Sequence, residues 1–268
     1  MSTSAGARDL VLVTAAVIGL SALIEGPIAW LTALVLAAAV AVGSLQVLGE
    51  ADATPASGVP LDSLLVPTVT AFAGVGVIRL VPVGYLLVPA VALLAWYLDR
   101  VLATEARILR SPHGPTPGDR TAVQVEAIVS GALAFGGVAA LIPGGLPGVG
   151  GGPVEVDAAG LVGLVVADAA VAGAIGWRMA ALRVGAVRDL GWFALTTGSV
   201  IGIGALALRA VGIQRLLGPA LLAVVLFLWD AIHAATPASR RDARRIWETV
   251  LLAVLAIAVV AWSMILRP

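Results

Sequence analysis

A single carboxylate interrupts a long apolar segment in the second half of the chain. Asp168 is preceded by Leu-Val-Gly-Leu-Val-Val-Ala and followed by Ala-Ala-Val-Ala-Gly, near the centre of segment 158–177. A charged carboxylate at the centre of a bilayer costs at least about 2.5–3.5 kcal/mol, so such a group is usually paired, protonated or turned toward a wet cavity. Asp168 is therefore either a proton- or cation-coupling site or a hydrogen-bonded acid that holds two helices together.

Three other charged residues are candidates for contact with a substrate or ion. Glu25 lies at the turn Glu25-Gly26-Pro27, where an acid at a helix end is the alternative interpretation. Arg79 and Arg209 end two apolar segments. They either bind an anionic headgroup or substrate, or extend toward the membrane interface as long basic side chains do. The candidate substrate- or ion-coupling residues are thus Asp168, Glu25, Arg79 and Arg209.

The remaining ionisable residues favour structural roles. Glu126 and Glu248 stand about one turn into apolar segments, where the helix dipole favours a carboxylate. Asp230 and His233 are three residues apart and share one helix face. We expect a surface hydrogen bond there, because no other His or Cys is available to complete a metal site.

The chain has no Lys and no Cys. It therefore has no lysine for a phosphate loop, for a Schiff base with PLP or for retinal, and no thiolate. We predict no catalytic constellation, no metal site and no cofactor.

The composition defines the class of fold that must position these residues. Hydrophobic residues make up 60% of the 268 residues and charged residues 12%, and the mean hydropathy is +1.05. Ordinary soluble domains are about 45–50% apolar and about 25% charged. A water-soluble fold could not bury so much apolar surface, so the prediction is an all-α polytopic integral membrane protein surrounded by lipid. The formal net charge of zero argues against nucleic acid as a partner.

The apolar pattern predicts about nine transmembrane segments within one domain, 1–268. A spanning helix needs about 20 residues. Tight breaks occur at Glu25–Pro27 and at Arg79–Pro82, and either could be a kink or a re-entrant turn, so eight spans is the alternative. The predicted segments are 10–25, 27–48, 63–79, 81–98, 121–143, 158–177, 190–209, 216–234 and 246–266.

The arginines predict an orientation in the cell membrane. With nine spans and a cytoplasmic N-terminus, the C-terminus lies outside. Of the 16 basic residues, only Arg79, Arg209, Arg215 and Arg267 then lie outside, in agreement with the positive-inside rule. The loop 49–62 disagrees, because it lies inside with three acids and no basic residue.

An internal similarity suggests a repeat. The stretch Arg79–Ala90 resembles Arg209–Ala220 without a gap, and both follow one predicted span and enter the next. An offset of four spans preserves direction, so we predict a parallel four-plus-four repeat with halves 9–110 and 121–235 and an added helix, 246–266. The alternative is a chance match in a sequence rich in Ala, Val, Leu and Gly.

A small-residue motif affects the predicted packing of segment 190–209. Gly198 and Gly202 are four residues apart, which allows another helix to approach closely. With Thr196, Thr197 and Ser199 beside them, the motif predicts a segment buried within the bundle.

Three functional classes agree with these features. The first is a transporter or permease for a small solute, an ion or a lipid-type molecule. The second is a non-catalytic structural or assembly subunit, which would bind other membrane proteins or further copies of itself. The third is a membrane-embedded lipid-modifying enzyme, which usually needs clustered Asp or His side chains. A cavity that reaches Asp168 would favour transport, whereas burial against a helix without a cavity would favour the structural subunit.

Overall fold

The computed structural model of the chain is helical in all of its regular elements, within the residues that it describes. These are 5–24, 26–51, 58–111, 113–146, 156–183, 186–211 and 217–234, together with 250, 251, 254, 255 and 258. The elements are α1 (Ala5–Ser21), α2 (Pro27–Ala51), η1 (Leu61–Leu64), α3 (Leu65–Val77), η2 (Ile78–Leu80), α4 (Leu87–Leu109), α5 (Pro117–Leu141), α6 (Ala158–Ala181), α7 (Val187–Ala210) and α8 (Leu217–Ala234).

Six helical stretches in the described part are long and apolar enough to cross a membrane. They are Pro27–Glu50, Leu61–Leu80, Leu87–Leu109, Pro117–Leu141, Ala158–Ala181 and Val187–Ala210. The second of these combines η1, α3 and η2, and α8 is a shorter apolar helix. A helical membrane bundle is therefore confirmed. The predicted segment 246–266 lies outside the described residues, apart from the few just named.

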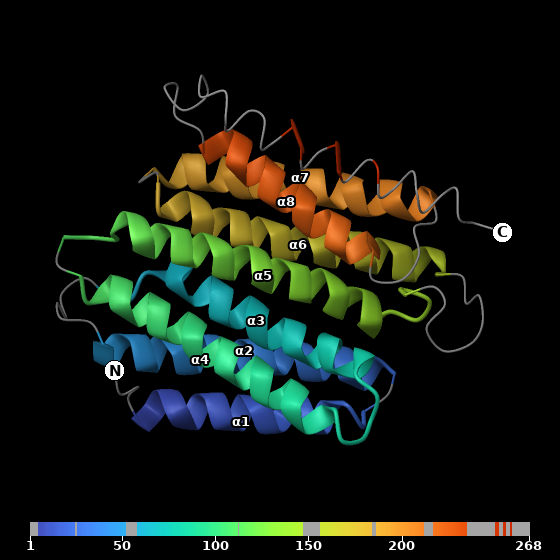
Figure 1. The fold of residues 1–268 in the computed structure, drawn as a ribbon, viewed down its shortest axis with the longest axis horizontal. Helices are drawn as coiled ribbons and strands as arrows, with labels where there is room; N and C mark the ends of the chain where they lie inside the picture. Colours follow the sequence, from blue (N-terminus) through green and yellow to red (C-terminus); the bar gives the residue numbers. More distant parts are fainter. Residues whose placement is uncertain are drawn as a thin grey trace.

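Successive helices alternate in direction across the bundle (Figure 1). At the break Arg79–Pro82 the chain turns back from α3 into α4, so this break separates two helices and is not a kink. We predicted that the second of these helices begins at residue 81, but α4 begins at Leu87. The intervening turn holds Pro82 and also Gly84, whose φ of 152° is a conformation that L residues rarely adopt.

The start of α5 also differs from the prediction, since the predicted segment begins at residue 121 and α5 begins at Pro117. Thr116 Oγ1 accepts the N–H of Asp119 at 3.2 Å, and Asp119 Oδ2 accepts the N–H of Thr116 at 3.1 Å. This capping box, with Pro117 at the first helical position, starts α5 there. The helix therefore begins in the polar residues that precede the apolar segment.

The helices pack in two groups of four. In the first group α1 packs mainly on α4 and α2 on α3; in the second, α6 packs mainly on α7, and α5 contacts α6 and α8 to a similar extent. The groups meet chiefly where α3 packs on α5, with smaller contacts of α3 with α6 and of α4 with α5. A Cβ atom at Gly76 would lie 2.3 Å from the Cα atom of Gly137. The two backbones therefore touch at this crossing.

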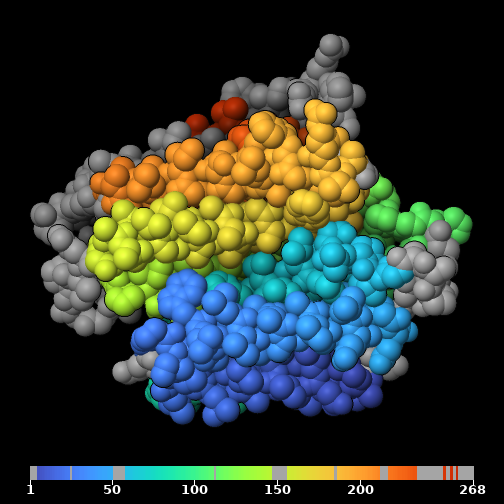
Figure 2. All heavy atoms as spheres, turned by 180° about the vertical axis from the view of Figure 1, so that it is seen from behind, coloured from blue at the N-terminus to red at the C-terminus, as the bar shows by residue number. Residues whose placement is uncertain are grey.

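The outer surface of the bundle is apolar. Figure 2 shows α2, α6 and α7 forming much of one face. On these helices large side chains such as Leu31, Val166 and Ile203 are exposed, as expected for contact with lipid. The prediction that segment 190–209 is buried was wrong, because only one side of α7 packs inward. Its Gly198 does allow close contact, since a Cβ atom there would lie 2.8 Å from the carbonyl oxygen of Ala169.

The two ends of the bundle carry different charged groups. We call the end at which α3, α5 and α7 begin the basic end, because Arg100, Arg107, Arg178 and Arg183 lie there, near the ends of α4 and α6. The end at which α3 and α7 finish is called the opposite end. Both Arg79 and Arg209 lie at the opposite end.

Candidate functional site

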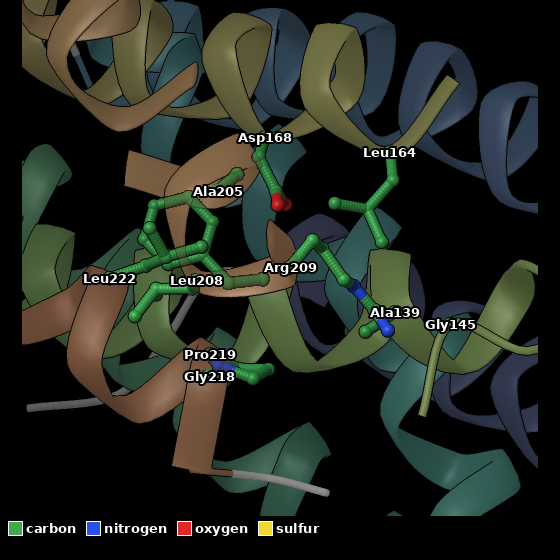
Figure 3. A pocket seen from close by; sticks show the side chains of 11 residues that line it. Ala139, Gly145, Leu164, Asp168, Ala205, Leu208, Arg209, Gly218, Pro219 and Leu222 are labelled. Carbon is green, nitrogen blue, oxygen red and sulfur yellow. The ribbon is translucent and has the colours of Figure 1, made fainter. Parts of the chain in front are cut away.

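Asp168 lies in a small cavity enclosed by α5, α6, α7 and α8 (Figure 3). The residue is 2% exposed, and its side chain points from α6 into the cavity. The cavity volume is about 30 Å³, and about 10–15 Å³ is enough to hold one water molecule. The apolar part of the lining includes Phe135, Leu164 and Leu222. The cavity can thus hold a water molecule or a small ion beside the carboxylate.

Arg209 brings a positive charge to the same cavity from the end of α7. Its side chain extends toward Ala139 and Gly145 (Figure 3), and its Nη1 atom donates to the carbonyl oxygen of Gly144 at 3.4 Å. Asp168 and Arg209 interact electrostatically but do not form one of the ion pairs found among the described residues. Asp168 Oδ1 is buried and has no hydrogen-bond partner within the protein. The carboxylate therefore keeps a free oxygen close to a guanidinium that binds elsewhere.

The turn after α5 forms the wall that Arg209 contacts. Gly144 has a φ of 73°, in the left-handed region that glycine adopts most readily. A Cβ atom at Gly145 would lie 2.1 Å from the carbonyl oxygen of Ala139. This turn folds tightly against the end of α5, where its carbonyl groups are within reach of Arg209.

The four predicted coupling residues have three different outcomes. Asp168 and Arg209, which belong to different helices, line one cavity. Arg79 lines a second cavity at the opposite end, with a volume of about 300 Å³. Glu25 lies outside the described residues. The cavity that Asp168 and Arg209 share was not predicted.

The second cavity lies between the two groups of helices. Ala22 and Val83 line it from the first group, and Ala140 and Pro143 from the second. The guanidinium of Arg79 donates through Nη1 to the carbonyl oxygen of Ile24, just after α1. Ala139 lines both cavities, so the two lie next to each other.

At the basic end, one buried arginine joins the two groups of helices. Arg178 of α6 donates through Nε to Glu105 Oε1 of α4 at 3.0 Å. Its two Nη groups donate to Glu105 Oε2 and to Asp62 Oδ2 of η1. Glu105 is 1% exposed and Arg178 4%. The sequence analysis did not identify this cluster, which also gives a basic partner to one acid of the loop 49–62.

A second polar cluster lies between α4 and α5. Glu126 accepts from Thr104 Oγ1 at 2.9 Å and from Arg100 Nε at 3.3 Å. We predicted an acid stabilised by a helix N-terminus, but Glu126 is buried and well past the first turn of α5. Its role is to bind these two side chains of α4. Further along, Ser130 Oγ lies 3.0 Å from Tyr97 OH and 2.7 Å from Thr70 Oγ1.

Asp230 forms a third cluster, and the prediction for it was wrong. Instead of a surface hydrogen bond with His233, Asp230 is fully buried. It accepts from Gln124 Nε2 at 2.7 Å, and Arg183 lies 2.7 Å from its carboxylate oxygens. His233 is exposed and bonds to the carbonyl oxygen of Trp229. Within the described residues no group of three or more His, Asp or Glu side chains could hold a metal ion.

No protein family, curated protein or solved structure matches this chain.

Proposed function

We propose that this membrane protein is a transporter or permease for a small solute or ion, and that Asp168 couples transport to the binding of a proton. The observation that carries the proposal is the cavity at Asp168. A buried carboxylate there keeps a free Oδ1 atom and lies close to Arg209. A purely structural acid would be expected to bind a neighbouring helix through both of its oxygens.

The chemistry of coupling rests on two alternative partners for Arg209. When Asp168 is charged, the guanidinium is attracted both to the carboxylate and to the carbonyl oxygen of Gly144. When Asp168 binds a proton, that attraction is lost and the hydrogen bond to Gly144 is favoured. Protonation is thereby linked to the contact between the end of α7 and the turn after α5. Such a pair of alternative contacts is the kind of two-state element that transport needs.

The packing of the two groups supports a parallel repeat, with halves 9–110 and 121–235 and an added ninth helix, 246–266. In each half the second helix packs mainly on the third, and the first contacts both the second and the fourth. Arg79 and Arg209 end the third helix of their halves. Each donates to a carbonyl in the turn after the first helix of its own half, at Ile24 and Gly144. Repeated halves are a common way to build a transporter with two access states.

We further propose nine spans in the cell membrane, with the basic end and the N-terminus in the cytoplasm and the C-terminus outside. The arginine distribution is the main support. The loop 49–62 has three acids and no basic residue, which is unusual on the cytoplasmic side. Its Asp62 binds Arg178, so this acid has a basic partner in the structure. In this orientation Arg79 and Arg209 lie near the outer surface.

Proton movement into liposomes tests the role of Asp168. The full chain is reconstituted in liposomes that enclose a pH-sensitive dye, and the internal pH is followed after the external medium is acidified. We expect faster acidification than in protein-free liposomes, and we expect Asp168→Asn to abolish the difference. Asp157→Asn is the matched control: it removes an exposed acid from the start of the same helix and keeps a good N-cap residue.

Two results would contradict the proposal. One is a wild-type protein that acidifies the liposomes no faster than the lipid alone. The other is an Asp168→Asn variant that reconstitutes equally well and acidifies them as fast as the wild type. Circular dichroism and gel filtration in detergent confirm that each variant is folded before it is reconstituted.

A further inference from the structure

We propose that the cavity around Arg79 binds an oxyanion, either a carboxylate or a phosphate group, that arrives from the outer side of the membrane. This inference rests on the proposed function only for the orientation of the bundle and for the view that a solute enters it. It adds the chemical class of the group that is bound.

The cavity has the size and the position of an entry site. Its volume is about 300 Å³, at the lower end of the range of about 300–1,000 Å³ typical of ligand pockets. Both halves contribute to its lining, Ala22 and Val83 on one side and Pro143 and Leu146 on the other. Among the described residues that line the cavity, Arg79 alone carries a charge.

Arg79 has donors to spare. A guanidinium has five N–H donors in a fork that fits a carboxylate or a phosphate. In the structure Nη1 of Arg79 donates to the carbonyl oxygen of Ile24. Among the described residues no carboxylate forms an ion pair with Arg79. An oxyanion could therefore accept hydrogen bonds from two of the remaining N–H groups of Arg79.

Comparison with other arginines explains why Arg79 is the residue that attracts an anion. At the basic end, Arg178 and Arg183 are paired with buried carboxylates. At the opposite end, Arg209 interacts with Asp168. Arg79 is at the same end, but none of the described residues that line its cavity is acidic. Its positive charge is thus available to a ligand, in surroundings that only partly screen it.

The absence of cysteine from the chain provides a clean measurement. Val83 is 67% exposed and lines the cavity, so a Val83→Cys variant has one thiol, located at the proposed site. The purified variant is placed in phosphatidylcholine nanodiscs, and its rate of reaction with a neutral maleimide is measured with increasing inorganic phosphate or acetate. Chloride at equal ionic strength is the reference.

We expect both oxyanions to slow the labelling of Val83→Cys in a saturable manner. A second substitution, Arg79→Gln, should raise the half-protecting concentration by about tenfold to about a hundredfold, because charge-assisted hydrogen bonds to the anion are lost. Arg188→Gln is the matched control, because Arg188 is an exposed arginine at the basic end, and it should leave protection unchanged. Tyr85→Cys controls for access, since Tyr85 belongs to the same turn but does not line the cavity.

The lipid composition distinguishes two sources of the anion. Protection by free phosphate in phosphatidylcholine discs indicates a soluble ligand. Protection without added anion in phosphatidylglycerol discs, lost in Arg79→Gln, indicates a lipid headgroup. Equal labelling under all conditions, or equal protection in the Arg79→Gln variant, would overturn the proposal.

Failure of this inference and failure of the proposed function give different results. Loss of anion protection leaves the proton flux and its dependence on Asp168 unchanged. Conversely, an absence of proton flux leaves the protection of Val83→Cys intact. Labelling of intact cells with a membrane-impermeant maleimide tests the orientation separately, since Val83→Cys should react from outside.

Discussion

Replacing Arg178 with methionine should destabilise the protein strongly. Arg178 is the partner that Glu105 and Asp62 share, and its side chain is 5% exposed. Methionine keeps much of the length of the side chain but removes the charge and all of the donors. Glu105, with a side chain 1% exposed, would then be left without its basic partner inside the bundle.

The magnitude follows from the burial of the three groups. Removing one partner of a buried ion pair costs about 3–5 kcal/mol, because the remaining charge is left uncompensated. Asp62, with a side chain 19% exposed, retains some access to solvent and should contribute less than Glu105. We therefore expect the free energy of unfolding to fall by about 3–5 kcal/mol in Arg178→Met, mainly because of Glu105.

A double-mutant cycle measures this coupling. Glu105→Leu alone should also lower the free energy of unfolding. The double variant Arg178→Met, Glu105→Leu should lose less free energy of unfolding than the two single variants lose together. The reason is that apolar side chains can replace a buried ion pair at little cost. Unfolding is followed by circular dichroism during titration with sodium dodecyl sulfate. Arg188→Met is the control, because Arg188 is an exposed arginine at the same end.

One result would refute the reasoning about Arg178. If Arg178→Met changes the stability by no more than about 0.5 kcal/mol, as expected of Arg188→Met and other surface substitutions, the ion pairs with Glu105 and Asp62 do not support the fold.

Two further predictions concern the helix crossing and the helix start. Gly76→Ala should destabilise by about 1–3 kcal/mol or more, because the new Cβ atom meets the backbone of Gly137. Gly136→Ala, where a Cβ atom meets nothing within 4 Å, should be neutral or stabilising; equal effects in the same unfolding titration would argue against a close crossing of α3 and α5. Thr116→Ala should cost about 1 kcal/mol by removing the N-cap of α5, while Thr116→Ser should restore most of it. No difference between these two variants would mean that the capping box contributes little.

Much of the fold follows directly from hydropathy. Eight of the nine predicted segments correspond to helical stretches of the described chain, because a long apolar run in a membrane protein has few alternatives to a helix. The starts of α4 and α5 were less predictable. Each depends on a local conformation, at Gly84 and at Thr116–Asp119, that average hydropathy does not detect.

The site was only partly predictable, for a different reason. Asp168 and Arg209 were each recognisable as charged residues in or at the end of an apolar segment. Their common cavity depends on how four helices pack, which the composition of any one helix does not determine. The Arg178 cluster illustrates the same limit, since Asp62 and Arg178 are separated by 116 positions. The sequence indicated only that Asp62 and Arg178 lie on the same side of the membrane, and not that they form an ion pair.

The distribution of polar groups along the interface between the halves gives the proposed transport a structural basis. At the basic end this interface is held by cross-links from Arg178 to Glu105 and from Arg100 to Glu126. At the opposite end the same interface contains the Arg79 cavity, with the Asp168 cavity next to it. An alternating-access cycle requires one end to be closed while the other is hollow. With the proposed function and orientation, this conformation would be a state open toward the outside, and the reverse state would require Arg178 to separate from Glu105 and Arg100 from Glu126. That separation exposes charges to water. We therefore expect the basic end to open and the outer cavities to close in one cooperative step.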